Sequence, residues 1–184
     1  DYHVMSPARG AKAFFDKQKQ CLIPSSIYPH YFKDHDVIHT ASFAKVLYLA
    51  FTIPPDEVIT DKDQITGKVV GVIRDENTWD YAERFKIEGA TYVKVGSLAS
   101  LVEMLYRGRI DIAIHDFSDF TEYVDFVKKP PPLYSEQHPM AIDDVVITCH
   151  ETAENRAFMT KLDAEVREII KEGLGPYFKK ASIE

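Results

Sequence analysis

Three carboxylates stand in this sequence where they could bind or transform a small molecule. Asp116 comes just after 110–114, a short apolar run with the composition of a buried strand, and Asp75 and Glu76 come just after a second such run, 69–73. In open α/β sheets, ligands bind at the carboxyl ends of the strands. A carboxylate in such a place can bind a cationic group through a charge-assisted hydrogen bond, or act as a general acid or base.

Each of these positions also suits a purely structural role. Asn77 and Thr78 have side-chain oxygens that can cap the helix expected next, and Asp116 can cap the helix expected from Phe117. Trp79, the single tryptophan, either covers a binding cleft or packs inside its own lobe. The residue types leave both interpretations open, so Asp116, Asn77, Thr78 and Trp79 are all candidates for ligand contact.

Hydroxyl groups follow the first predicted strand, 21–23. Ser25 and Ser26 come directly after it, and Tyr28 is a candidate aromatic wall. A hydroxyl in that place can hydrogen-bond a polar ligand or the backbone of its own loop. We predict Ser25, Ser26 and Tyr28 as further ligand contacts, with the loop role as the alternative.

Three histidines, His30, His35 and His39, are interleaved with aspartates. On a helix, His35 and His39 would lie one turn apart and could share a metal ion. Pro29 and the β-branched pair at 37–38 disfavour that helix. The sequence therefore predicts a polar surface loop and no metal site.

Two cysteines, Cys21 and Cys149, fall on predicted strands of the same lobe. A disulfide is compatible with that placement, but buried free thiols are the expected state because cysteine packs as a small apolar residue. The sequence contains no Gly-x-Ser-x-Gly elbow, Walker loop, HExxH or paired CxxC motif. We therefore expect no catalytic residues and no cofactor.

The segment that positions Asp116 alternates between strand-like and helix-like patterns. Apolar β-branched runs predict strands, and apolar residues at helical spacing behind a capping residue predict helices. The expected elements, in order, are strand 68–74, helix 79–88, strand 91–95, helix 98–107, strand 110–114 and helix 117–129. Such alternation predicts a parallel sheet with right-handed crossovers.

The flanking segments are less regular. They predict a helix over 7–20 with Phe14 and Phe15 inward, strands or extended chain rather than one helix in 38–54, and a strand over 144–149. A final helix carries its apolar residues on one face, which is expected to pack inward. These residues are Phe158, Leu162, Val166, Ile169 and Ile170.

Proline-rich and charged stretches frame the central segment and predict two lobes. Lobe 1 is discontinuous, residues 1–65 and 134–184, and lobe 2 is residues 66–133. The chain then crosses between lobes twice, near 54–66 and near 130–143. Two crossings are typical of a hinge.

Composition narrows the class of protein. The 184 residues include 22 Lys and Arg against 29 Asp and Glu, a formal net charge of −7, and 45% of them are apolar. The apolar fraction is enough to build a core. An acidic chain lacks the cation clusters that hold a phosphate backbone, so we expect no nucleic-acid partner. No apolar run reaches the ~20 residues of a membrane span, and the start at Asp1 resembles no targeting segment, as if processed or cut from a longer chain.

Several motifs, in their order and spacing, resemble bacterial extracellular solute-binding proteins of family 3. The segment 67–72 (GKVVGV) and the segment 108–116 (GRIDIAIHD) resemble the opening strand and the third strand of that family's second lobe. The segment 7–15 resembles a first-lobe helix, and 155–173 resembles the C-terminal helix. The resemblance implies a two-lobed, type II periplasmic-binding-protein-like α/β fold with parallel-sheet βαβ lobes and a double-crossing hinge, in which the N-terminal part of lobe 1 is missing.

The same resemblance implies a function. Family members capture a small polar ligand, amino-acid-like or an amine, between two lobes for an ABC transporter, and a membrane permease or sensor recognises the closed form. Asp116 matches the residue that pairs with the ligand ammonium, and Ser42 lies near a hinge-side serine. Where the family has small hydroxyl residues, this chain has Asp75 and Glu76, which would repel an anion and favour a cationic or neutral ligand. A periplasmic or extracellular monomer is expected.

Other functions stay open at this point. The same fold serves as the ligand-sensing ectodomain of signalling receptors. A few relatives of the fold are dehydratases with carboxylates in the cleft, a role that Asp75, Glu76 and Asp116 could fill. A fragment that has lost part of lobe 1 could also bind nothing well.

Overall fold

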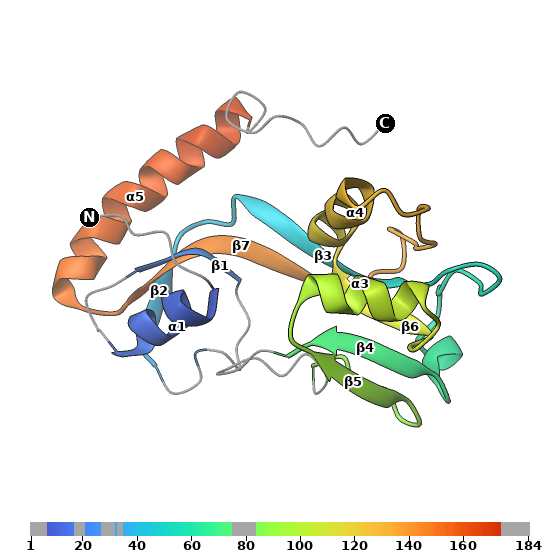
Figure 1. Ribbon diagram of the computed structural model, residues 1–184. Helices are drawn as coiled ribbons and strands as arrows, with labels where there is room; N and C mark the ends of the chain where they lie inside the picture. Colours follow the sequence, from blue (N-terminus) through green and yellow to red (C-terminus); the bar gives the residue numbers. More distant parts are fainter. Residues whose placement is uncertain (1–6, 17–20, 27–31, 33–34, 75–83, 174–184) are drawn as a thin grey trace. The chain divides into compact units, whose positions relative to one another are not determined.

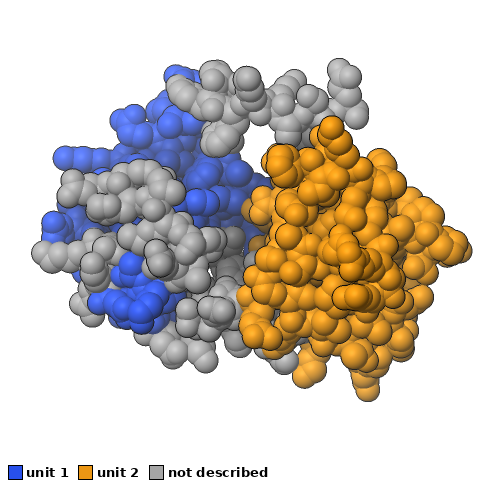
Figure 2. All heavy atoms as spheres, viewed as in Figure 1, with its two compact units in different colours: residues 1–45, 143–184 blue, residues 46–142 orange. Residues whose placement is uncertain are grey.

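The computed structural model of this chain describes residues 7–16, 21–26, 32, 35–74 and 84–173. Contacts divide the chain into two compact units, which Figure 2 shows in different colours. Unit 1 comprises residues 1–45 and 143–184, and unit 2 comprises residues 46–142. Two long strands, β3 (Ala44–Phe51) and β7 (Ala141–His150), each begin in one unit and end in the other.

Unit 2 contains the predicted parallel sheet (Figure 1). β4 (Val69–Ile73) pairs in parallel with β5 (Thr91–Val95) and with β6 (Ile112–Asp116), and β3 pairs antiparallel with β6. Hydrogen bonding follows the strand order β1-β7-β3-β6-β4-β5, with β2 also paired to β7. The predicted α/β class is therefore confirmed.

The helices of unit 2 begin where capping residues were expected. α3 (Leu98–Tyr106) begins after Ser97, whose side chain accepts a hydrogen bond from the Ser100 amide, and α4 (Phe117–Phe126) begins after Asp116. A single 3-10 turn, η1 (Lys62–Ile65), precedes β4. The first half of the helix predicted over 79–88 lies outside the described residues. In the second half only Arg84 is helical and residues 85–88 are turn or irregular, so the predicted end at residue 88 is wrong.

The sheet of unit 2 has an apolar cluster on each face because alternate residues of a strand point to opposite sides. Ile112 and Ile114 of β6 pack in one cluster and Ala113 in the other. Gly71 of β4 lies on the second face, where a Cβ atom would collide with the side chains of Leu101 and Ile110. The close approach of α3 to β4 thus explains the glycine of the GKVVGV motif.

Unit 1 has a different strand arrangement from the one predicted. β1 (Cys21–Ser26) and β2 (Val37–His39) both pair antiparallel with β7. The prediction of a parallel sheet in each lobe therefore holds for unit 2, whereas the strand pairs that the structure describes in unit 1 are antiparallel. β7 enters unit 1 from unit 2, and both β1 and β2 run in the direction opposite to it.

The described part of unit 1 includes two helices. α1 (Pro7–Asp16) carries Phe14, which is buried as predicted, and α5 (Ala153–Glu172) is the C-terminal helix. The predicted inward face of α5 is confirmed at Val166, which is buried, but not at Phe158 and Ile170, which are 52% and 37% exposed. Asn155 and Met159 are buried instead. The buried side-chain amide of Asn155 donates to the carbonyl oxygen of His150 over 2.8 Å.

The compact units and the predicted lobes differ at their boundaries. Residues 46–65 and 134–142, assigned to lobe 1 from the sequence, pack within unit 2. Ile59 and Ile65 share a buried cluster with β4, and Thr52 forms a backbone bridge to Leu133. The proline-rich stretches are loops within this unit. The division into ligand-binding lobes at 65/66 and 133/134 stays a prediction.

No helix among the described residues is long and apolar enough to cross a membrane.

Candidate functional site

Asp116 lies at the carboxyl end of β6, as predicted, and begins α4. Its Oδ1 accepts a hydrogen bond from the Asp119 amide over 2.9 Å, so the capping role is confirmed. Burial raises the pKa of the Asp116 carboxyl above its ordinary value, and the negative charges of Asp119 and Glu122 raise it further, against the lowering effect of hydrogen bonds from the Asp119 and Ser118 amides. The carboxylate is thus half-desolvated beside two like charges, an arrangement that favours a cationic partner.

Tyr48 pairs with Asp116 and Arg84 lies over the Tyr48 ring, and the sequence reasoning singled out neither residue. Tyr48 is the cross-strand partner of Asp116 in the β3–β6 pair. Cζ of Arg84 lies 4.7 Å from the centre of the Tyr48 ring, a cation–π distance. Their proximity depends on an antiparallel register between distant segments, for which the sequence carries no signal.

His115 lies next to Asp116 on the opposite face of β6. Its side chain is 12% exposed, and its Nε2 lies 3.9 Å from Oδ2 of Asp119. Burial lowers the pKa of His115 to about 4, although the Asp119 carboxylate opposes this. His115 is therefore neutral at pH 7 and contributes no charge to the acidic end of α4.

Acidification is expected to destabilise the protein through His115. The folded-state pKa of about 4 lies below the ordinary 6.5, so His115 favours folding fully above pH 6.5 and loses that contribution as pH falls toward 4. Between pH 7 and 4.5 the loss amounts to about 2–3 kcal/mol at 1.36 kcal/mol per pKa unit. Urea unfolding at both pH values should give a smaller loss in His115→Gln than in the wild type. Equal losses would contradict the prediction.

Ser42 uses its hydroxyl inside unit 1. Its Oγ lies 2.9 Å from Oδ1 of Asp144 and 2.9 Å from the carbonyl oxygen of Ala44. Ser42 is therefore held by the chain near the start of β3, and ligand contact by this residue stays a prediction.

Ser25 is a buried hydroxyl in β1. It is 6% exposed, and its Oγ has no hydrogen-bond partner among the residues that the structure describes. A buried hydroxyl without a partner has hydrogen-bonding capacity to spare. Ser26 also lies on β1, but its side chain is not described. Tyr28 and the candidates Asn77, Thr78 and Trp79 lie outside the described residues.

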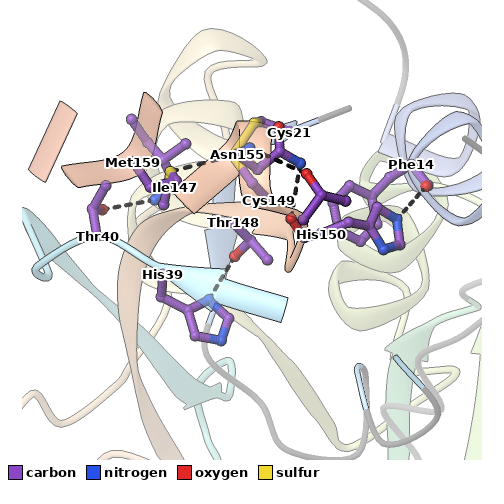
Figure 3. Close-up of a disulfide and its surroundings, with 11 residues drawn as sticks. Phe14, Cys21, His39, Thr40, Ile147, Thr148, Cys149, His150, Asn155 and Met159 are labelled. Carbon is purple, nitrogen blue, oxygen red and sulfur yellow. Dashed lines mark hydrogen bonds between the residues drawn. A yellow bond between two sulfur atoms is a disulfide. The ribbon is translucent and has the colours of Figure 1, made fainter. Parts of the chain in front are cut away.

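Cys21 and Cys149 form a disulfide, which corrects the expectation of free thiols (Figure 3). The two residues are direct partners in the β1–β7 pair, with their Cα atoms 4.1 Å apart. Sγ of Cys149 also lies 3.2 Å from Sδ of Met159 on α5. The two cysteines are 128 positions apart in the sequence, and the pairing register of β1 and β7 brings their sulfur atoms together. The sequence does not reveal that register.

Two described histidines of unit 1, His35 and His39, lie beside phenylalanine rings. His35 lies 4.6 Å from Phe15 between ring centres, and His39 hydrogen-bonds Thr148 through Nδ1 over 2.8 Å. In the described part of the chain, no three His, Cys, Asp or Glu side chains are placed to hold a metal ion. His30 lies outside that part.

A pocket of about 360 Å³ opens in unit 2 at the amino ends of the parallel strands, whereas Asp116 lies at a carboxyl end. Lys68 and Asp111, which line it, precede β4 and β6 at the amino ends of these strands. The Oδ2 atom of Asp111 accepts a hydrogen bond from the Val69 amide over 2.7 Å, so Asp111 ties the starts of the two strands together. This pocket does not include the candidates predicted from the sequence.

Comparison with known proteins identifies the fold. No protein-family description matches the sequence, and no curated protein matches it. Solved structures do match. A mutant of ArgBP, the arginine-binding protein from T. maritima, is 16% identical with a TM-score of 0.71, over 96% of this chain and 76% of that one.

Two further structures extend the comparison. The GluR0 ligand-binding core in complex with L-glutamate is 13% identical with a TM-score of 0.72, over 91% of this chain and 73% of that one. The ancestral amino acid-binding protein AncCDT-1, a precursor of cyclohexadienyl dehydratase, is 12% identical with a TM-score of 0.67, over 92% of this chain and 73% of that one. At such low identity these likenesses show the fold: this chain has the type II periplasmic-binding-protein fold.

Proposed function

We propose that this protein is a non-catalytic, extracytoplasmic solute-binding protein that closes its two lobes around a small cationic or neutral polar ligand. The observation that carries the proposal is Asp116, a partly buried carboxylate at the carboxyl end of a parallel strand. The fold supports it, since the matching structures include proteins named for arginine binding and for an amino acid ABC transporter.

Charge determines the class of ligand. Asp116, Asp119 and Glu122 place three carboxylates around the start of α4, and burial keeps His115 neutral. An ammonium or guanidinium group gains a charge-assisted hydrogen bond there, whereas a dicarboxylate meets repulsion. Ser25, Ser26, Tyr28 and Ser42 of unit 1, together with Asn77, Thr78 and Trp79 of unit 2, are the further proposed contacts.

The disulfide supports an extracytoplasmic location. Disulfides persist in oxidising compartments and are rare in the cytosol. A periplasmic or extracellular location fits a protein that delivers its ligand to a membrane permease, the partner that we propose here. We propose a monomer without a cofactor and without a nucleic-acid partner, in line with the net charge of −7.

Binding can be tested without knowing the ligand. Native mass spectrometry of the purified protein should show an added mass that disappears on denaturation, because closure slows ligand release. If the protein is ligand-free, thermal shifts with arginine, lysine, putrescine, glutamine and glutamate should show stabilisation by cationic or neutral compounds, following RT ln(1 + [L]/Kd). Stabilisation by glutamate alone would contradict the proposed ligand class.

The substitution Asp116→Asn is expected to weaken binding of the stabilising compound about tenfold or more, the equivalent of one charge-assisted hydrogen bond. Asparagine caps helices as well as aspartate does, so the fold should remain. Asp125→Asn, on an exposed residue of the same helix, is the matched control and should bind normally. Titration calorimetry of the three proteins measures the difference. Equal affinities would remove Asp116 from the site.

Two alternatives have support from the comparisons. A sensing ectodomain is favoured by the likeness to the GluR0 ligand-binding core, and flanking sequence with a membrane span and an output domain would establish it. A dehydratase-like enzyme is favoured by the likeness to AncCDT-1. Turnover of prephenate or arogenate that is lost in Asp116→Asn would support the enzyme over the binding protein.

A further inference from the structure

The chain between β2 and β3, residues 40–43, runs beside β7 but lies outside both strands. The Thr40 amide donates to the carbonyl oxygen of Ile147 over 3.0 Å. The Ile147 amide donates in return to Oγ1 of Thr40 over 3.1 Å, where a regular ladder would use a backbone carbonyl (Figure 3). A side chain therefore replaces one backbone acceptor in this gap.

A carboxylate from α5 holds the middle of the gap. The Ala41 amide donates to Oδ1 of Asp163 over 2.5 Å, and Nε of Arg167 donates to Oδ2 of the same carboxylate over 2.6 Å. Arg167, and to a lesser degree the Ala41 amide, lower the pKa of Asp163, so this carboxylate is charged at neutral pH. Because α5 belongs to unit 1, the contact fastens the gap to that unit.

A second carboxylate, Asp144 of β7, holds the end of the gap. Its Oδ1 accepts from Oγ of Ser42 over 2.9 Å and from Nζ of Lys45 over 3.2 Å. These partners, Ser42 first, lower the pKa of Asp144. The Ser42 hydroxyl has one proton and two acceptors, since the carbonyl oxygen of Ala44 also lies 2.9 Å away. Asp144 thus adds side-chain links between the outgoing chain and the returning strand, next to the backbone hydrogen bond from the Phe43 amide to the Val145 carbonyl oxygen over 3.0 Å.

These contacts lie where the chain leaves unit 1 and where it returns. Unit 1 ends at Lys45 on the outgoing strand and resumes at Asp143 on the returning strand. Both carboxylates bind the last residues of unit 1 before the chain enters unit 2. Side-chain bonds of this kind restrain a segment without extending the regular ladder.

We propose that Asp144 and Asp163 are positioning residues that keep residues 40–45 fixed to unit 1, so that the chain bends between the units only beyond Lys45 and before Asp143. The proposal rests on the two-lobed closure proposed above. It differs from the sequence-based prediction, which put the crossings near 54–66 and 130–143. The restraint on residues 40–45 acts mechanically. Because the position of bending is restricted, the ligand-free protein has fewer open conformations, and closing therefore costs less free energy.

Hydrogen exchange of the ligand-free full chain tests the restraint, so its result does not depend on finding a ligand. In the Asp144→Ala/Asp163→Ala variant, peptides covering 40–45 should exchange about tenfold faster or more, the equivalent of about one charge-assisted hydrogen bond. Peptides covering 110–116 in unit 2 should be unchanged. Asp125→Asn is the control and should match the wild type throughout.

A milder pair of substitutions distinguishes positioning from general stability. Asp144→Asn and Asp163→Asn retain an acceptor oxygen, so together they should restore most of the protection at 40–45. Small-angle X-ray scattering of the ligand-free alanine variant should show a wider spread of radii than the wild type, and the asparagine variant an intermediate one. Unchanged exchange at 40–45 overturns the proposal. So does faster exchange over the whole chain in both variants, or an unchanged spread of radii.

Discussion

Removal of the Cys21–Cys149 disulfide is expected to lower the free energy of unfolding by about 5 kcal/mol. The bond closes a loop of 128 positions, and in the chain-entropy account a loop of that size restricts the unfolded chain by about this amount. Since native domains have only about 5–15 kcal/mol of stability, the loss is large enough to unfold the protein at 37 °C. Urea unfolding of Cys21→Ala/Cys149→Ala against the oxidised wild type measures it.

Reduction provides the control for this prediction. A disulfide-reducing agent added to the wild type should reproduce most of the loss of stability without any change of sequence, and it should leave the double alanine variant unaffected. Wild-type stability that is the same with and without reductant, when mass spectrometry confirms the free thiols, would contradict the loop-closure account.

Truncation of Phe120 should have the second-largest effect, about 3–5 kcal/mol for Phe120→Ala, the usual range for a buried phenylalanine. Phe120 of α4 is fully buried and stacks on Phe51 of β3 with ring centres 4.0 Å apart. The substitution removes the ring, and the closely packed cluster around it can refill only part of the cavity. Denaturant unfolding provides the measurement.

The same helix offers a matched control. Phe126 of α4 is 80% exposed, so Phe126→Ala should change the free energy of unfolding by less than about 0.5 kcal/mol. Should Phe120→Ala fail to fold, Phe120→Leu retains most of the volume and should still cost more than Phe126→Ala. Similar losses of unfolding free energy at the two positions would contradict the burial of Phe120 and the exposure of Phe126.

Local patterns predicted most of unit 2. The β-branched runs became β4 and β6, and Ser97 and Asp116 cap the helices that follow them. Such signals work because a strand or a cap depends on residues a few positions apart, whose chemistry is visible in the sequence. Asp116 was found for the same reason: its place at the end of a strand follows from the strand.

Contacts between distant segments were not predictable in the same way. The sequence favoured free thiols, yet Cys21 and Cys149 are bonded because of the β1–β7 register. It does not reveal that the Ser42 hydroxyl hydrogen-bonds Asp144, 102 positions away. It predicted Phe158 on the inward face of α5, yet Phe158 is exposed, and the buried Asn155 hydrogen-bonds the His150 carbonyl oxygen.

By itself, then, the sequence determined the α/β class, the parallel direction of β4, β5 and β6, and the position of the acidic end of α4, since each follows from local periodicity, capping and charge. Only the tertiary structure decided the disulfide, the face that α5 buries, and the neighbours of Asp116. The physical reason is that strand register and helix rotation are set by packing over the whole unit, where many alternatives are locally equivalent and only one fills the core.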